Sequence, residues 1–276
     1  MAHPQIAVFA RLADGGAERL RAIEGQATLL GRTMHAIAYD ATHDEIIVPQ
    51  QFGQAILTYA GDASGEAPPK RVIIGSETQL RRPDRVAVDS QNNEILVPED
   101  DKILIFPREG NGNVAPIRVL GGRGAGVADT NAVAVDARRN LLVVAGSYWQ
   151  GDDRVNALMI FDRTASGDTK PKRVITGLSQ NRNIAIDPVG GWIYVTLPGT
   201  VADPYGYVGV WNIQDDGEVP PRFRIGGPDG ALRLPRGVVL DPKNESVIVS
   251  DKKLNAILTF KVPEIFAATH TEQASR

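Results

Sequence analysis

The chain has 276 residues, and its 30 Lys and Arg against 33 Asp and Glu give a formal net charge of −3. This length is enough for one sizeable hydrophobic core, and repeat β folds of this size often form a single domain. The balanced charge argues against a nucleic-acid partner, the lack of any apolar run near roughly 18 residues argues against a membrane span, and the absence of cysteine excludes disulfides and thiolate sites.

The predicted elements recur with a period of roughly 50 residues. A short apolar segment that ends in Asp occurs five times, at Asp40, Asp89, Asp136, Asp187 and Asp241. A second apolar segment ends in an aromatic residue six times, at Phe9, Tyr59, Phe106, Phe161, Trp211 and Phe260. The first five aromatic residues are followed by a glycine six residues on, at Gly15, Gly65, Gly112, Gly167 and Gly217. A second glycine follows them sixteen residues on, at Gly25, Gly75, Gly122, Gly177 and Gly227.

Each repeat predicts four short strands, which we name a to d in chain order. Strand a ends in the Asp, whose carboxylate can accept backbone hydrogen bonds across a tight turn to strand b. Strand c ends at the aromatic residue, and a glycine-bearing hairpin leads to strand d. Four strands per repeat with no helical periodicity are typical of the blades of a β-propeller, so we predict an all-β propeller of four-stranded blades.

Side-chain sizes agree with this prediction. A small residue stands in the middle of strand a in four copies, at Ala38, Ala87, Ala134 and Ala185. Inner strands crowd the axis of a propeller, which favours a small side chain there. Strand d carries an arginine at one position, in Arg71, Arg118 and Arg173. We interpret these arginines as charges that protect an exposed outer edge from pairing with another sheet.

Three segments resemble the NHL-type repeat of bacterial β-propellers: residues 83–89, 106–116 and 235–241. The resemblance covers residues 5 to 262. It implies the propeller fold, but it says little about function, because similar scaffolds serve binding modules, lyases and lactonases. Similar bacterial propellers are often exported, so the resemblance implies a periplasmic or secreted location. The repeat here is a few residues longer than the familiar form.

The first copy is incomplete. Residues 5–25 supply only strands c and d, whereas the carboxyl end of the chain supplies strands a, b and c. The propeller has five blades if the two ends share one blade, or six if the natural chain begins further upstream, and the resemblance favours six. We expect the propeller domain to span residues 1–266 and residues 267–276 to form a disordered tail.

A set of polar residues stands five positions before each strand-a Asp. These residues are His35, Asp84, Asn131, Arg182 and Arg236. In a propeller the d–a and b–c connections share one face, so these side chains are predicted to surround the mouth of the central channel and to bind a ligand. The alternative is that they are merely polar because connections are polar.

Two neighbouring repeats carry longer b–c connections, over residues 146–156 and 197–207. Their aromatic and acidic side chains are Tyr148, Trp149, Asp152, Asp153, Asp203, Tyr205 and Tyr207. Insertions in repeat proteins often gather on the binding face, and aromatic rings beside carboxylates suit a sugar, a peptide or a cation. The alternative is that the two connections pack on each other and close the channel mouth.

The leading hypothesis is a non-catalytic propeller that binds a small molecule, a glycan or a peptide at this face. One alternative is a metal-dependent hydrolase of lactonase type, with Asp84, Glu99, Asn131 and Asp251 as oxygen ligands. Two arginines in the predicted ring disfavour a cation there, so we expect no metal and no cofactor. His35 is the sole candidate for a general base at this face. A second alternative is a scaffold that binds another protein.

Overall fold

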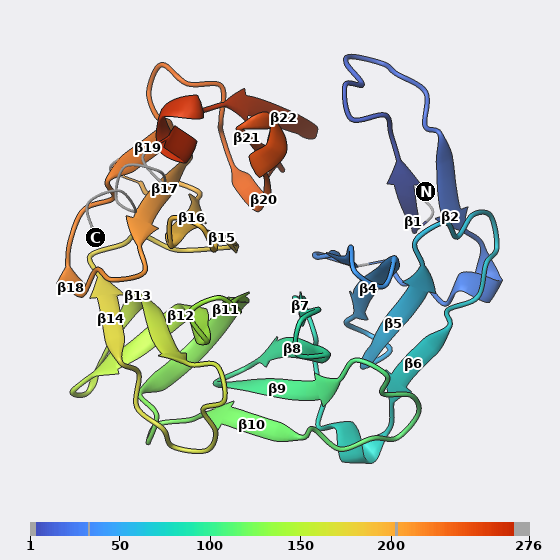
Figure 1. The fold of residues 1–276 in the computed structure, drawn as a ribbon, viewed down its shortest axis with the longest axis horizontal. Coiled ribbons are helices and arrows are strands. Elements are labelled where there is room, and N and C mark those ends of the chain that lie inside the picture. Colours follow the sequence, from blue (N-terminus) through green and yellow to red (C-terminus); the bar gives the residue numbers. More distant parts are fainter. Residues whose placement is uncertain (1–3, 33, 202–203, 268–276) are drawn as a thin grey trace. The chain divides into compact units, whose positions relative to one another are not determined.

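The computed structural model describes residues 4–32, 34–201 and 204–267, whose regular elements are nearly all β-strands (Figure 1). These residues form 22 strands in six sheets. The chain divides into two compact units, which are described separately below. The first contains residues 1–99 and 104–118, and the second contains residues 100–103 and 119–276.

The first unit holds two sheets and most of a third, each an antiparallel meander. The first sheet pairs β1 (Gln5–Val8) with β2 (Arg21–Glu24). The second contains β3 (Ala38–Asp40), β4 (Glu45–Gln50), β5 (Ala55–Ala60) and β6 (Arg71–Ile74). The third contains β7 (Ala87–Asp89), β8 (Glu94–Glu99), β9 (Lys102–Pro107) and β10 (Arg118–Gly121). Two 3-10 turns, η1 (Gln26–Thr28) and η2 (Ser76–Thr78), follow β2 and β6.

The second unit holds the remaining three sheets. The fourth contains β11 (Val127–Asp136), β12 (Leu141–Gln150), β13 (Asp153–Asp162), β14 (Arg173–Thr176) and the short parallel strand β18 (Gly217–Glu218). The fifth contains β15 (Ile184–Asp187), β16 (Trp192–Leu197), β17 (Tyr207–Asn212) and β19 (Phe223–Gly226). The sixth contains β20 (Pro235–Asp241), β21 (Ser246–Asp251) and β22 (Ala256–Lys261), with η3 (Pro242–Asn244) between β20 and β21. A short helix over 263–267 follows β22.

The fold is a β-propeller of five blades, because five of the sheets begin with a strand a. The prediction of four-stranded blades is confirmed, and so is the incomplete first copy, which supplies only β1 and β2. The five blades agree with one of the two predicted numbers and not with the six that the resemblance favoured. The sharing of one blade by the two chain ends stays a prediction, because β1–β2 and β20–β22 form separate sheets. Within each unit the first strands of neighbouring sheets contact one another: β3 contacts β7, β11 contacts β15, and β15 contacts β20.

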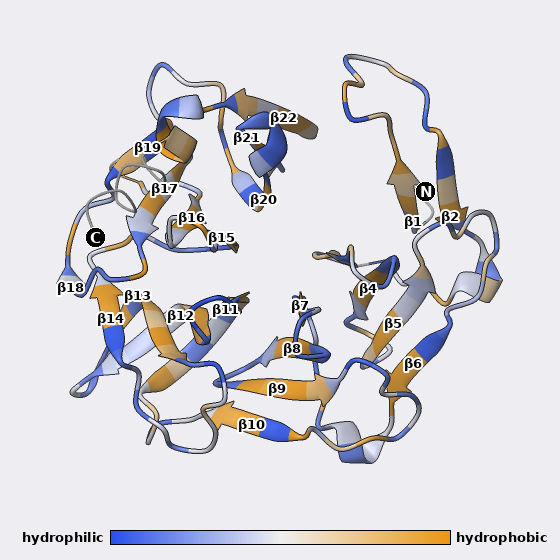
Figure 2. Cartoon of the chain, in the orientation of Figure 1, coloured by the Kyte–Doolittle hydropathy of each residue, from blue (hydrophilic) through white to orange (hydrophobic). Residues whose placement is uncertain are grey.

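The hydrophobic core lies between neighbouring sheets rather than within one sheet. The middle strand β9 is largely hydrophobic (Figure 2), and the second half of β13, residues 157–161, is fully buried. Four of the aromatic residues that end strand c, Tyr59, Phe106, Phe161 and Trp211, are at most 1% exposed. Phe9 is 50% exposed, because its sheet has no strands a and b to cover it.

The last residues of the described chain belong to the core of the second unit. Ile265 and Phe266 are buried against the fifth and sixth sheets, and the Phe266 ring stacks on Tyr194 with 6.3 Å between ring centroids. The helix over 263–267 therefore closes the apolar edge of these two sheets. The predicted tail begins within it, at residue 267, and residues 268–276 lie outside the described part of the chain. No helix among the described residues is long and apolar enough to cross a membrane.

The repeated glycines are explained by backbone conformation. At the sixth position after the aromatic residue, Gly65, Gly112, Gly167 and Gly217 have φ of +61°, +73°, +57° and +76°. This left-handed region disfavours any residue with a Cβ atom. Each of these glycines also pairs in parallel with strand d of the preceding sheet. Gly112, for example, donates from its N to Val72 O at 2.7 Å and accepts from Ile74 N at 3.0 Å. The turn therefore joins one blade to the next.

The strand-a Asp residues cap the a–b turn as predicted. Asp136 is fully buried, and its Oδ1 accepts from Arg139 N at 3.0 Å. Asp40 is also fully buried and accepts from the backbone N of Thr42 at 3.0 Å. Burial by itself raises the pKa of Asp40, but hydrogen bonds from Ser90, His43 and Thr42 outweigh burial and lower it. These carboxylates stabilise the turns as acceptors of backbone N–H groups.

The strand-d arginines have a different role from the predicted edge protection. Arg118 makes a two-pronged contact with Glu94 at 2.7 and 2.8 Å. Arg71 reaches Glu45 at 2.5 Å and Glu109 at 3.3 Å. In both sheets the glutamate is the first residue of strand b. The arginines are mostly buried, so they brace the blade from within instead of repelling a neighbouring strand.

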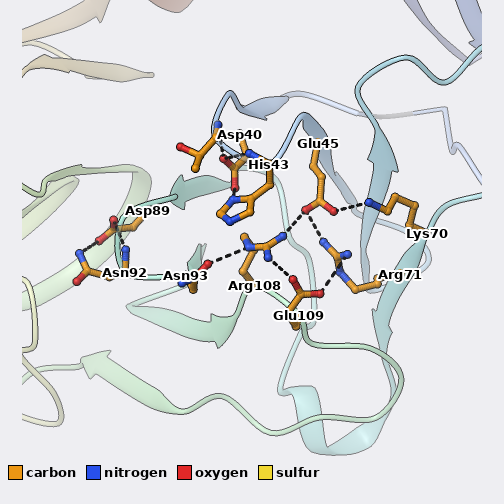
Figure 3. Close-up of polar contacts among 11 residues, drawn as sticks. Asp40, His43, Glu45, Lys70, Arg71, Asp89, Asn92, Asn93, Arg108 and Glu109 are labelled. Atoms are coloured by element: carbon orange, nitrogen blue, oxygen red, sulfur yellow. Dashed lines mark hydrogen bonds and ion pairs between the residues drawn. The ribbon is translucent and has the colours of Figure 1, made fainter.

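Glu45 is the centre of an ion-pair cluster in the first unit (Figure 3). The residue is 1% exposed, and its carboxylate contacts Lys70 Nζ at 2.8 Å and Arg108 Nη1 at 2.7 Å, in addition to Arg71. Burial by itself raises the pKa of Glu45, but the hydrogen bonds from Arg71 and Lys70 outweigh it and lower the pKa from 4.5 to about 2. The cluster therefore depends on an ionised Glu45.

Candidate functional site

The longer b–c connection of the fourth sheet is not a loop. Residues 146–150 continue β12, residues 153–156 continue β13, and the pairing extends to Trp149 opposite Arg154 and Gln150 opposite Asp153. The start of β11 pairs along the same extension, with Val127 opposite Tyr148. The predicted irregular insertion is thus a long β-hairpin. Regular pairing holds the side chains at its tip in defined positions.

Trp149 lies near the tip of this hairpin, beside two arginines. The guanidinium carbon of Arg123 lies 4.4 Å from the centroid of the indole ring, and that of Arg154 lies 5.0 Å from it. Cation–π contacts of this kind contribute roughly 0.5–1 kcal/mol at exposed sites. Arg123 also contacts Asp152 Oδ1 at 2.7 Å, and Arg154 donates to the carbonyl of Ala128. The indole ring therefore orients both guanidinium groups.

A pocket of about 470 Å³ opens beside Trp149. Its lining residues come from two connections, from the start of β11 and from the hairpin β12–β13: Asp100, Asp101, Arg123, Ala128, Asp129, Trp149 and Arg154. Asp100 and Asp101 form the b–c turn of the third sheet, and Arg123 lies in the d–a connection that follows it. The pocket is lined by d–a and b–c connections, as the propeller topology predicts for a binding face, and all its residues belong to the second unit.

Backbone contacts hold the walls of the pocket in place. Asp100 has φ of +51°, and its carbonyl accepts from Thr130 N at 2.8 Å and from Thr130 Oγ1 at 2.9 Å. Asp101 O accepts from Gly122 N at 2.8 Å. A Cβ atom on Gly146 would lie 2.0 Å from Asp129 O, so only glycine lets β12 approach β11 so closely.

The charges of the pocket are not paired with one another. Among the described residues, no ion pair joins the carboxylates of Asp100, Asp101 or Asp129 to Arg123 or Arg154. Asp129 Oδ1 accepts from Thr130 N at 3.0 Å. Acidic and basic groups therefore face one pocket while remaining available to other groups.

The predicted ring of polar residues falls in both units. In the first unit, His35 Nδ1 contacts the carboxylate of Asp84, and Arg85 Nη1 donates to His35 O at 2.8 Å. His35 is exposed and Asp84 is half-buried. These contacts bring the two predicted residues together. Their ligand-binding role stays a prediction.

In the second unit, Asn131, Arg182 and Arg236 are all half-buried. Asn131 Nδ2 donates to Asn181 Oδ1 at 2.9 Å, and Asn181, fully buried, donates in turn to Gly146 O at 3.0 Å. Arg182 Nη2 contacts Gln180 Oε1 at 2.5 Å. The carbonyl of Arg236 accepts from Thr196 Oγ1 at 3.3 Å. Asn131 is thus linked by hydrogen bonds through the buried Asn181 to the backbone of the hairpin at Gly146.

The second predicted insertion, residues 197–207, is a connection between β16 and β17. Tyr205 is 39% exposed and does not line the pocket, and Asp203 lies outside the described residues. Tyr207 is packed against the core, with Arg224 4.7 Å from its ring centroid. In the first insertion, Tyr148 lies close over Gly126, and Asp153 is exposed at the hairpin tip.

Two of the residues considered as oxygen ligands of a metal, Glu99 and Asp251, accept backbone hydrogen bonds with their carboxylates. The Glu99 carboxylate accepts from Arg82 N at 2.7 Å and from Arg81 N at 3.1 Å. Asp251 accepts from four backbone N–H groups, those of Arg233, Leu234, Lys253 and Leu254, at 2.7 to 3.0 Å. Burial raises the pKa of Asp251, but these hydrogen bonds outweigh burial and lower it. Within the described residues, no group of three or more His, Asp or Glu side chains could hold a metal ion.

Sequence reasoning missed most of the pocket. It singled out Trp149 and Asp152, but not Asp100, Asp101, Arg123, Asp129 or Arg154. Arg123 lies in the glycine-rich d–a connection over residues 121–126, which holds none of the predicted site residues. A signal was available: Asp100 and Asp101 occupy the b–c turn of the repeat just before the long hairpin, on the predicted binding face.

No protein-family model matches the chain, and no curated protein sequence matches it. Solved structures do match its fold. One is a chain in a crystal structure of the mitotic checkpoint complex, with a TM-score of 0.60 and 14% identity over 89% of this chain. This chain covers 65% of that one, which is less than two thirds of its length.

Two further structures support the same fold. A chain of a nidogen–laminin complex has a TM-score of 0.56 and 14% identity, with 95% of this chain and 92% of that chain covered. The WD40 β-propeller domain of Doa1 has a TM-score of 0.53 and 11% identity, with 88% and 76% covered. At such identities the similarity concerns the fold alone, and that fold is the β-propeller.

Proposed function

We propose that the protein is a non-catalytic binding propeller of the NHL-repeat type, whose ligand occupies the pocket beside Trp149. The observation that carries this proposal is the arrangement of the pocket charges. Carboxylates and guanidinium groups converge on one cavity of about 470 Å³ without pairing across it. Ligand pockets of proteins typically have volumes of roughly 300–1,000 Å³ and a few placed polar groups.

The proposal agrees with how the residues are held. The hairpin β12–β13 is a paired extension, and binding sites built on regular strands are more rigid than sites on loops. Asn181 and Gly146 support this hairpin from its buried side. The second, third and sixth sheets have short b–c turns, so the paired extension of β12 and β13 is a departure from the repeat.

A screen by thermal unfolding tests the proposal. A library of free amino acids, short peptides and mono- and oligosaccharides is added to the wild type, to Trp149→Ala and to Phe52→Ala. Phe52 is the matched control, because it is an aromatic residue 76% exposed in the b–c turn of the second sheet. We expect compounds that raise the Tm of the wild type and of Phe52→Ala but not that of Trp149→Ala. Compounds that stabilise all three equally, or a library in which no compound depends on Trp149, would overturn the proposal.

A protein partner is the second candidate. The mitotic checkpoint and nidogen–laminin structures are complexes of proteins, which shows that proteins with this fold can serve such a role. The exposed tip of the hairpin, with Asp152 and Asp153, could contact a partner together with the pocket. Short peptides in the screen test this alternative, because a peptide segment of a partner would use the same pocket.

A further inference from the structure

The pocket beside Trp149 carries both signs of charge on separate segments of the chain. Asp100 and Asp101 stand in the turn between β8 and β9, and Asp129 stands in β11. Arg123 and Arg154 stand in a connection and in the hairpin β12–β13. The cavity therefore has acidic and basic groups that meet around one space instead of neutralising each other.

Asp100 and Asp101 are held in place through their backbone, which leaves their carboxylates available to a ligand. The carbonyls of Asp100 and Asp101 are engaged by Thr130 and Gly122, which holds their backbone. Within the described residues, neither carboxylate takes part in a hydrogen bond or an ion pair. Two carboxylates on this turn line the same pocket, so a ligand cation there would meet charges of the opposite sign. An ammonium group, with three donors, fits such a pair.

The basic side is oriented by Trp149. Arg154 uses one nitrogen for the carbonyl of Ala128, and Arg123 uses one for Asp152. Each guanidinium group has five N–H donors in a planar fork, so both retain donors for another acceptor. A guanidinium fork held against an aromatic ring is well suited to a carboxylate.

We propose that the ligand is dipolar: a free amino acid or a short peptide with both ends unblocked. Its ammonium group lies at Asp100 and Asp101, and its carboxylate lies at Arg123 and Arg154. This inference rests on the proposed function, because it names the ligand class of the same pocket. A purely anionic ligand would meet three carboxylates, and a purely cationic one would meet two guanidinium groups. A neutral sugar would leave both sets of charges without a counter-charge.

Titration of the wild type with an unblocked dipeptide library, the same library N-acetylated, and the same library amidated at the carboxyl end tests this inference. The readout is heat of binding. We expect each blocked library to bind at least about tenfold more weakly than the unblocked one, because blocking one end removes the charge-assisted hydrogen bonds of that end.

Variants assign each end of the ligand. In the double variant Asp100→Asn with Asp101→Asn, we expect the preference for a free amino end to disappear while the preference for a free carboxylate remains. In Arg123→Gln we expect the preference for a free carboxylate to disappear while the preference for a free amino end remains. Asp62→Asn, which changes an exposed carboxylate in the first unit, is the control and should bind like the wild type. The Tm of each variant shows whether it is folded.

The outcomes separate the two proposals. If sugars bind in a Trp149-dependent manner while unblocked dipeptides do not bind, the pocket is a binding site and the dipolar ligand is wrong. If blocked and unblocked dipeptides bind equally, the dipolar ligand is wrong as well. If no compound depends on Trp149, both the proposed function and this inference fail.

Discussion

The cluster around Glu45 and the pocket around Trp149 both contain carboxylates and guanidinium groups, but only the cluster pairs them with one another. Around Glu45, one carboxylate that is 1% exposed contacts Lys70, Arg71 and Arg108. Around Trp149, the one ion pair that the pocket arginines make within the described part of the chain is the contact of Arg123 with Asp152, whose side chain is 99% exposed. Buried charges must be paired, whereas exposed charges need not be. Unpaired charges around a cavity can therefore serve a ligand, and paired buried charges serve the fold.

The largest loss of stability is expected at the buried ion-pair cluster around Glu45. Glu45→Ala leaves the mostly buried Arg71 and Arg108 with only the exposed carboxylate of Glu109 as an acidic partner. Removal of one partner of a buried ion pair costs about 3–5 kcal/mol, so we expect a loss of this size in the free energy of unfolding, measured with urea. Asp162→Ala is the control, because its contact with Lys172 at 2.6 Å is half exposed and should contribute less than about 1 kcal/mol. Equal losses in both variants would contradict the distinction drawn here.

The same cluster predicts a dependence of stability on pH. The pKa of Glu45 is lowered from 4.5 to about 2 in the folded protein, so the unfolded chain binds more protons between these values. The stabilisation by Glu45 is fully present above pH 4.5 and is lost as the pH falls toward about 2. We expect the difference in unfolding free energy between wild type and Glu45→Gln to shrink over this range. A difference that is constant with pH would show that folding does not lower the pKa of Glu45.

A smaller effect is expected at the turns that join the blades. Gly112→Ala places a Cβ atom at φ of +73°, and a left-handed conformation costs about 1–2 kcal/mol for such a residue. No atom lies within 4 Å of the added Cβ, so the cost comes from the backbone alone. Gly16→Ala is the control, since it also meets no atom within 4 Å and lies outside the left-handed region. Equal Tm values for the two variants would contradict this explanation of the repeat.

The smallest effect on stability is expected at the pocket. Arg123→Ala removes an exposed cation–π contact and an exposed ion pair, which together contribute about 1 kcal/mol or less. We expect its Tm to stay close to that of the wild type while its affinity for unblocked dipeptides falls. A variant that unfolds early would assign Arg123 to the fold instead of to a ligand.

The repeat pattern predicted the fold because each of its marks has a local physical cause. Asp136 caps a turn within its own repeat, Gly112 adopts a left-handed conformation, and Phe106 fills the space between sheets. The number of strands in each blade follows from these marks.

The pocket could be predicted only in part because its residues meet through long-range pairing. Trp149 was identified as an exposed aromatic in an insertion. Asp100 and Arg123 reach it through contacts within the second unit, such as that of Thr130 N with Asp100 O, which no local pattern reveals. The strand-d arginines were misinterpreted for the same reason, since Glu94 lies opposite Arg118 only after β8, β9 and β10 have paired.

The central claim is that the cavity beside Trp149 is the functional site, and the indole N–H signals in a nitrogen-labelled NMR spectrum test it most directly. The chain has three tryptophans, and Trp192 and Trp211 are buried at 3% and 1% exposure. With each compound that raises the Tm, the account predicts that the Trp149 signal moves while the other two stay in place. Compounds that stabilise the protein without moving the Trp149 signal would contradict it.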